Sequence, residues 1–242
     1  NLPNAQFVSL PGFDHVTAFL QTDLVLDHVT RFLDKTETGA LDEVTVAEIE
    51  AMVEETMARI NLPGFALGVV QDGELVYAKG FGVTSLEGGA PVTAQTVFQW
   101  AESSMAVTAM AVMQLVEAGK IDLDAPVTDY VPYFTLQDER YKEITVGQLL
   151  SHTSGIPDSG DAMADWENFM PEYDAGATER WVRNDLAMKG LLFAPGEGFE
   201  YSDLGYALLG AVIAEASGQT YEEYVNENLF QPLGMDKSTF LL

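Results

Sequence analysis

The sequence contains no cysteine, which excludes disulfide bridges, thiolate metal sites and a cysteine nucleophile. Basic residues are also scarce: 11 lysines and arginines stand against 38 aspartates and glutamates, giving a formal charge of −27. A surface of that sign repels phosphate backbones, so we expect no nucleic-acid partner. Because the acidic residues are spread along the chain, we interpret them as a strongly hydrated surface.

Long apolar runs are missing as well. None approaches the roughly 18–20 residues that cross a bilayer, so the sequence predicts no membrane span. The opening stretch NLPNAQFVSLPGF lacks a basic region followed by an apolar one, so no signal peptide is visible, although removal of one would leave the same pattern. The three histidines, His15, His28 and His152, show no metal-ligand spacing, and we expect neither a metal nor another cofactor.

Hydrophobic residues make up 47% of the 242 residues, enough for a packed core. Residues 1–45 are the least readable part, with mixed apolar spacing that is consistent with one or two short helices. A clearer helix is predicted over residues 45–60, where Thr45 can cap the start and Glu48 completes a capping box. Two β-rich runs then flank Asp72-Gly73, which predicts a hairpin.

Helices dominate the remainder of the chain. Apolar periodicity and terminal glycines predict a buried helix and three further ones, over residues 101–119, 144–151, 204–217 and 221–229. One hairpin followed by helices is an α+β order rather than a repeating βαβ pattern.

Five segments, in this order and at this spacing, together resemble the serine β-lactamase and penicillin-binding-protein superfamily. They are most similar to its class C-like branch, which includes D,D-carboxypeptidases, D-aminopeptidases and family VIII esterases. The segments are GVVQDGELVYAKGFG, TAMAVMQLVEAGKIDLDAPVTDYVPYF, LLSHTSGIPD, FAPGEGFEYSDLGYALLGAVIAEASG and LFQPLGMDKSTF. The resemblance covers residues 46–242 and implies an antiparallel sheet flanked by helices, with a mainly helical subdomain and a cleft between them. Residues 1–45 would then be an N-terminal extension of unclear role.

The family's nucleophile lies in a Ser-x-x-Lys motif at the start of a buried helix. Residues three apart share a helix face, so the lysine lies beside the serine hydroxyl and helps to deprotonate it. The family's Thr-x-Phe run corresponds to residues 96–98 and places Glu102 at the serine position. Thr108-Ala109 independently places Met105 at the lysine position. The resemblance therefore implies that both chemical groups are replaced.

Ser103 and Ser104 are the neighbouring hydroxyls, and neither has a lysine three residues later. One residue turns a helical side chain by about 100°, so we interpret them as polar residues of the first turn, with a substitute nucleophile as the alternative. Glu102 suits a helix N-terminus, where the dipole favours a carboxylate. With no cation beside it, it would repel the carboxylate of a penicillin or a peptide C-terminus.

Tyr201-Ser202-Asp203 matches the family's Tyr-x-Asn element, with aspartate in place of asparagine. Tyr201 is the surviving proton-transfer group, whereas Asp203 has no amide N–H to donate to a substrate carbonyl. We interpret His152 as part of a structural turn rather than of a catalytic triad. No Lys-Thr-Gly or His-x-Gly follows Tyr201, and family members usually continue for a hundred or more residues. We therefore expect a C-terminally truncated member, whose hairpin at residues 65–83 keeps an edge for another segment, another chain or self-association.

The primary hypothesis is a β-lactamase-related pseudoenzyme that binds a small amide or ester. The alternatives are an active esterase, peptidase or β-lactamase of the same family, a different carboxylate-based activity, and a structural or assembly protein. Engineered replacement of both residues in an active parent would give the same pattern at Glu102 and Met105. The resemblance favours an extracytoplasmic location.

Overall fold

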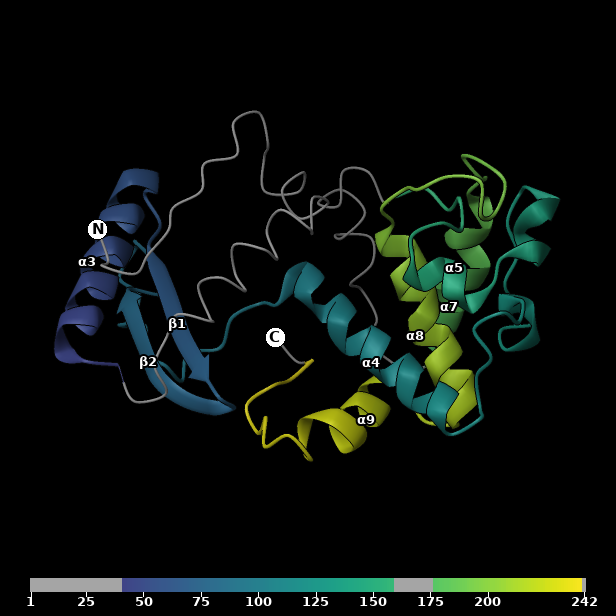
Figure 1. Cartoon of the computed structure of the whole chain (residues 1–242). Helices are drawn as coiled ribbons and strands as arrows, with labels where there is room; N and C mark the ends of the chain where they lie inside the picture. Colours follow the sequence, from purple (N-terminus) through teal and green to yellow (C-terminus); the bar gives the residue numbers. More distant parts are fainter. Residues whose placement is uncertain (1–40, 159–175, 241–242) are drawn as a thin grey trace. The chain divides into compact units, whose positions relative to one another are not determined.

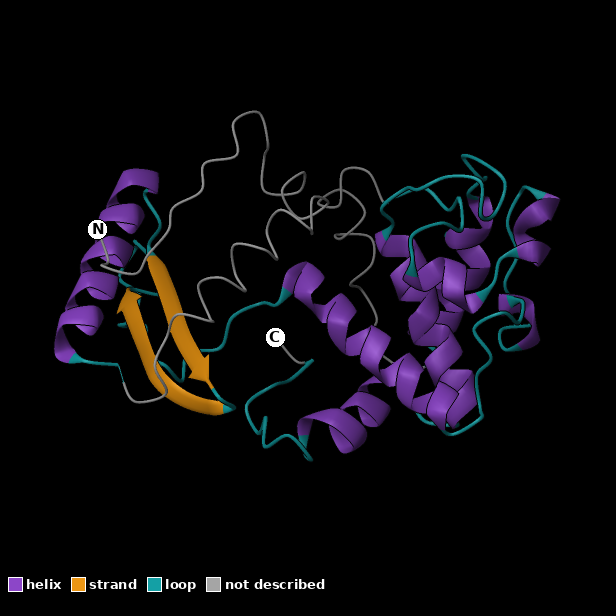
Figure 2. Cartoon of the chain, viewed as in Figure 1, coloured by secondary structure: helices purple, strands orange, loops and turns teal. Residues whose placement is uncertain are grey.

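The structure, a computed structural model, describes residues 41–158 and 176–240. The chain forms two compact units that meet between Val97 and Phe98 in the sequence (Figure 1). The first unit holds the strands, and the second is built from helices and loops (Figure 2). The short helices expected before residue 41 lie outside the described residues, as do His15 and His28. The predicted α+β class is confirmed.

The first unit contains the predicted hairpin. Strand β1 (Gly64–Gln71) pairs antiparallel with β2 (Glu74–Gly82), with a register irregularity between Val69 and Val70. The two turn residues, Asp72 and Gly73, have φ angles of 53° and 81°. Positive φ at both central residues is the mark of the turn type that Asp-Gly favours, so local sequence chemistry fixes this hairpin. In the described part of the chain this two-stranded sheet is the only one.

Helix α3 (Glu43–Ile60) precedes the hairpin, and its predicted cap is wrong. Asp42, not Thr45, is the N-cap residue, and its carboxylate accepts a hydrogen bond from the Thr45 backbone N–H at 2.7 Å. Aspartate is at least as good an N-cap residue as threonine, and the Thr45 backbone N–H three residues later is the donor that it caps. The helix therefore begins earlier than expected. Glu48 then lies inside the helix and makes no capping box, and its Oε2 is buried without a hydrogen-bond partner.

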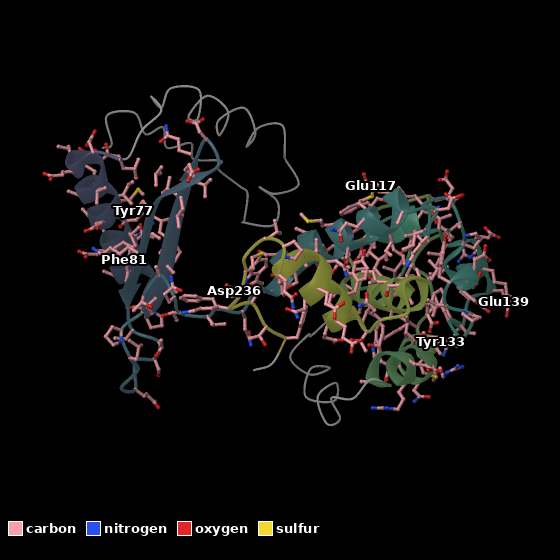
Figure 3. The ribbon with its side chains drawn as sticks, turned by 90° about the horizontal axis from the view of Figure 1, so that it is seen from below. Tyr77, Phe81, Glu117, Tyr133, Glu139 and Asp236 are labelled. Atoms are coloured by element: carbon pink, nitrogen blue, oxygen red, sulfur yellow. The ribbon has the colours of Figure 1, made fainter. Side chains whose placement is uncertain are left out.

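Helix α3 and the hairpin pack as two layers. Glu50 accepts a hydrogen bond from the Tyr77 hydroxyl at 3.1 Å and pairs with the Lys79 ammonium at 2.7 Å. Burial, followed by the Glu50 carboxylate, raises the pKa of Tyr77 to about 12. Tyr77 and Phe81 both lie on β2 (Figure 3), and Phe81 is buried, as is Val53 of α3.

The second unit is organised around helix α8 (Asp203–Ser217), which contacts four other helices. These helices are α4 (Ser104–Glu117), α5 (Val146–Leu150), α7 (Ala177–Asn184) and α9 (Tyr221–Val225). The core between them is fully buried, with side chains such as Leu115, Leu149, Leu208 and Val212 at its centre. Shorter turns complete the unit: η1 (Ala101–Ser103), η2 (Val127–Asp129), η3 (Glu139–Glu143), η4 (Leu186–Met188) and η5 (Asn226–Phe230).

The four predicted helices of this unit are present with shifted boundaries. The first begins as the 3-10 turn η1 before α4 and buries one face rather than its whole surface, at Thr108, Ala111, Val112 and Leu115. Helix α5 starts at a capping box formed by Thr145 and Gln148, which the sequence interpretation missed. The third ends at Gly218, whose φ of 78° gives the expected left-handed cap. The fourth continues past α9 as one π-helical turn.

Candidate functional site

The Tyr201-Ser202-Asp203 segment leads into α8 and is anchored by its central residue. Ser202 is only 1% exposed. Its Oγ accepts a hydrogen bond from the Gly205 backbone N–H at 2.9 Å and donates one to the Pro157 carbonyl at 3.0 Å. Ser202 therefore caps the helix and ties it to the segment that follows α5, which holds its two neighbours in fixed positions.

Asp203 connects to the same segment. Its backbone N–H donates to Asp158 Oδ1 at 3.0 Å, and its own Oδ1 accepts a hydrogen bond from the Tyr201 hydroxyl at 3.0 Å. The Tyr201 phenol thus faces the Asp203 carboxylate. Because Asp203 offers a carboxylate rather than an amide, it holds the phenol as a donor.

His152 lies in the turn after α5, and the structure also brings it against the Tyr201 segment. Its Nδ1 accepts a hydrogen bond from the Ser202 backbone N–H at 3.2 Å, while its carbonyl accepts one from Glu200 N–H at 2.9 Å. The imidazole is 4.9 Å from the Tyr201 ring and 5.0 Å from the Tyr206 ring between centroids. Burial lowers the pKa of His152, against the opposing pull of the Asp203 and Asp158 carboxylates, which favours the neutral ring.

The start of α4 carries the residues that the sequence analysis compared with the Ser-x-x-Lys motif of the family. Glu102 lies in η1 and is exposed, as are Ser103 and Ser104, whereas Met105 is half-buried in the first turn of α4. No side chain caps either η1 or α4. The charge of Glu102 acts on both Tyr201 and Asp203, so the starts of α4 and α8 contribute to one electrostatic neighbourhood.

Carboxylates dominate that neighbourhood. Burial raises the pKa of Tyr201, and so do the charges of Asp203, Glu102 and Asp158 and the hydrogen bond to Asp203. Burial also raises the pKa of Asp203, helped by Asp158 and Glu102 and opposed by the Tyr201 hydrogen bond and by His152. In the described chain, no lysine or arginine is among the charges that act on these two groups. Tyr201 therefore stays protonated at neutral pH and is poorly suited to accept a proton.

Other ligand-binding features are sparse. Over residues 41–158 and 176–240, no group of three or more histidines or carboxylates is arranged to hold a metal ion. A hollow of about 460 Å³ lies at the C-terminal end of α4, between Val116 and Tyr130, and includes none of the site residues. None of the described helices combines the length and apolar character that a membrane span requires.

Sequence reasoning singled out Glu102, Tyr201 and Asp203, interpreted His152 only as part of a structural turn, and did not single out Asp158. Asp158 and His152 contact the Tyr201 segment from 45 and 50 residues earlier in the chain. Both belong to the LLSHTSGIPD segment, whose resemblance to the family was the one available signal. Ser103 and Ser104 are exposed in the structure, and neither makes a side-chain hydrogen bond that caps α4.

Comparisons with known proteins agree on one family. The Beta-lactamase family model matches residues 49–241. The chain is 30% identical over 197 residues to Protein flp of Staphylococcus aureus (strain MW2), covering 80% of this chain and 38% of that protein. This chain therefore spans about two fifths of the length of that curated relative.

Solved structures show the same relationship. The octameric penicillin-binding protein homologue from Pyrococcus abyssi superposes with a TM-score of 0.67 at 35% identity, over 79% of this chain and 43% of that one. EstCE1, a hydrolase with promiscuous acyltransferase activity, superposes with a TM-score of 0.66 at 26% identity, over 78% of this chain and 51% of that one. The family-model match over residues 49–241 includes the segments that hold the candidate site.

Proposed function

Because this chain belongs to the β-lactamase family, we propose that it is a ligand-binding member in which acyl-enzyme chemistry has been lost. Glu102 and Met105 stand where the family motif has serine and lysine. A carboxylate and a thioether supply neither the hydroxyl that would be acylated nor the amine that would deprotonate it. The site would bind a small amide or ester without forming a covalent intermediate.

The observation that carries the proposal is the state of Tyr201. Its hydroxyl donates to Asp203 at 3.0 Å, and burial together with the surrounding carboxylates raises its pKa. A tyrosine that relays protons during acylation needs a lower pKa, for which a neighbouring cation is the usual cause. Tyr201 is instead arranged as a hydrogen-bond donor, and its single proton, which is given to Asp203 in the absence of a ligand, would turn to a carbonyl oxygen of the ligand on binding.

The same charges restrict the class of ligand. A serine–lysine pair carries one positive charge, whereas Glu102 and Met105 together carry one negative charge, so the site is two charge units more negative. Asp158 and Asp203 add to this field. A ligand carboxylate would be repelled, so the expected ligand is an uncharged amide or ester.

Binding is tested with two probes that differ only in their C-terminal group, which is an uncharged methylamide in one and a carboxylate in the other. N-acetylalanine methylamide and N-acetylalanine would be titrated into the ¹⁵N-labelled full chain while the amide resonances of residues 201–203 are followed. We expect the methylamide to shift these resonances and the carboxylate to do so more weakly, with the difference shrinking at high salt. The Tyr201→Phe variant, which keeps the ring and loses the hydroxyl, should bind the methylamide more weakly. Absence of any shift, or tighter binding of the carboxylate, would contradict the proposal.

Self-association is a second candidate role, supported by the sheet. Over the described residues the sheet consists of β1 and β2 alone, so its outer edges are places where a strand of another chain would pair. The homologue from Pyrococcus abyssi is octameric. Light scattering over a hundredfold range of concentration tests this role, and a mass that stays that of one chain would count against it.

A further inference from the structure

We propose that His152 is the positioning residue of the candidate site: its neutral imidazole holds Ser202, and thereby Tyr201 and Asp203, and protonation of Nδ1 releases them. The inference concerns how the site is held in shape and goes beyond the proposed binding of an amide or ester. It rests on the contacts of His152 with the segment that leads into α8.

The hydrogen bond fixes the chemical state of the ring. The Ser202 backbone N–H can only donate, so Nδ1, 3.2 Å away, must carry the lone pair. The proton of the neutral imidazole is therefore on Nε2. A proton added at Nδ1 would point at the Ser202 N–H and break the bond, leaving two donors facing one another.

The backbone of His152 makes the contact rigid. Its φ of 58° lies in the left-handed region, which histidine, asparagine and aspartate tolerate better than most side chains. Its carbonyl accepts a hydrogen bond from the Glu200 N–H at 2.9 Å, so His152 bonds to the residue before Tyr201 and to the residue after it. Breaking the Nδ1 bond frees Ser202, while the bond to Glu200 remains.

The titratable groups that face the ring decide the pH window. They are Tyr201 and Asp203 from the α8 side, Asp158 from the segment after α5, and Tyr206 within α8. Burial is the largest influence and holds the pKa of His152 below its ordinary value of 6.5, although both carboxylates oppose it. His152 therefore binds a proton more readily when its hydrogen bond to the Ser202 N–H is broken than when the bond is formed. The stabilisation from this hydrogen bond is complete above pH 6.5, and it is lost as the pH falls from there through the lower pKa that His152 has in the bonded state.

The contribution of Asp203 to the stability of the site depends on pH in the opposite direction to that of His152, so the two can be told apart. Its pKa is raised by burial, so its contribution favours the folded site at low pH and is lost as the pH rises above its ordinary value of 3.8. A loosening that occurs as the pH falls from 7 therefore cannot come from Asp203. Removing the Asp203 charge should lower the His152 midpoint further, because that charge favours the imidazolium.

The experiment uses the full chain with His15→Asn and His28→Asn, which leaves His152 as the only histidine. The ring ¹⁵N shifts and the Ser202 amide shift would be recorded from pH 8 to pH 5 without any ligand. We expect Nε2 to carry the proton at pH 8, and the Ser202 amide to titrate with the ring at a midpoint below 6.5. For each unit by which the pKa of His152 lies below 6.5, protonation of the ring lowers the equilibrium constant for forming the bonded state about tenfold.

Two further variants give readouts that a merely structural role would not produce. His152→Asn places an amide oxygen near the Nδ1 position and tolerates the positive φ, so the Ser202 amide should stay hydrogen-bonded and independent of pH. Asp203→Asn should move the His152 midpoint downward. A Ser202 amide that does not respond while the ring titrates, a proton on Nδ1 at pH 8, or a retained titration in His152→Asn would overturn the proposal. Since no ligand is present, failure here is distinct from failure of the proposed function.

Discussion

Two helix starts contribute to the candidate site, and they are built in opposite ways. Helix α8 begins at a side chain that is 1% exposed and makes two hydrogen bonds, whereas α4 begins at exposed serines with no side-chain cap. The entry to α8 is tied to the rest of the unit through His152 and Asp158. The entry to α4 is a 3-10 turn that starts at Ala101, with a φ of 44°.

The start of α8 supplies structural support to the site, whereas the start of α4 is where the reactive groups of the family motif would lie. Under the proposed register, the anchored start carries the tyrosine of the family motif, and the uncapped start carries Glu102 and Met105 in place of the hydroxyl and the amine. On that proposal, the structural support of the site is kept and its reactive groups are replaced. If this is correct, restoring groups at α4 should change activity, while removing contacts at α8 should change stability.

The largest expected effect is a gain of activity at the start of α4. Glu102→Ser combined with Met105→Lys should hydrolyse a short-chain p-nitrophenyl ester about 10²–10⁴ times faster than Glu102→Ser alone, because the lysine supplies the base for the serine. Initial rates of the full chain at neutral pH give the comparison, with Met105→Lys alone as the control. Adding Asp203→Asn should raise the rate further by removing a charge that keeps Tyr201 protonated. Equal rates for the double variant and Glu102→Ser would contradict this account of the motif.

The next effect compares the two capping serines. Ser202→Ala should lower the free energy of unfolding by about 1–2 kcal/mol, since it leaves the Gly205 N–H and the Pro157 carbonyl without their partner. Ser103→Ala, the matched change at α4, should stay within about 0.5 kcal/mol of the parent. Urea unfolding followed by the helical circular-dichroism signal measures both. Equal losses would mean that the two starts are equally anchored.

The smallest effect concerns the entry to α4. Ala101→Gly should stabilise the helical unit by up to about 1 kcal/mol, because alanine is strained at its φ of 44° and glycine is not. Ala118→Gly at the other end of the helix, where φ is −74°, should instead destabilise it by roughly 0.5–1 kcal/mol. Amide hydrogen exchange across α4 reports both changes. A loss of protection in Ala101→Gly would show that the alanine is not strained.

The sequence predicted features that depend on a few adjacent residues. The Asp72-Gly73 turn and the Gly218 cap follow from local backbone preferences, and both are present. The Thr45 cap was wrong because Asp42 offers a competing carboxylate to the same turn of helix. Two equally plausible caps a few residues apart cannot be ranked by pattern alone.

The site was predictable only as far as the motif extends. Glu102, Tyr201 and Asp203 were singled out by their register in the segments that resemble the family, and their roles stay a prediction. The roles of His152 and Asp158 depend on the packing of the segment after α5 against the start of α8, which no short sequence window encodes. The charge environment of Tyr201 likewise arises from residues far apart in the chain.

The central claim is that this chain forms no acyl-enzyme, and intact-protein mass spectrometry tests it directly. The full chain would be incubated with a chromogenic cephalosporin and, separately, with a short-chain p-nitrophenyl ester, and then compared with Ser103→Ala/Ser104→Ala. We predict an unchanged mass for both proteins. A mass increase by one acyl group that maps to Ser103 or Ser104, and disappears in the double-alanine variant, would contradict the claim and establish an active hydrolase with a displaced nucleophile.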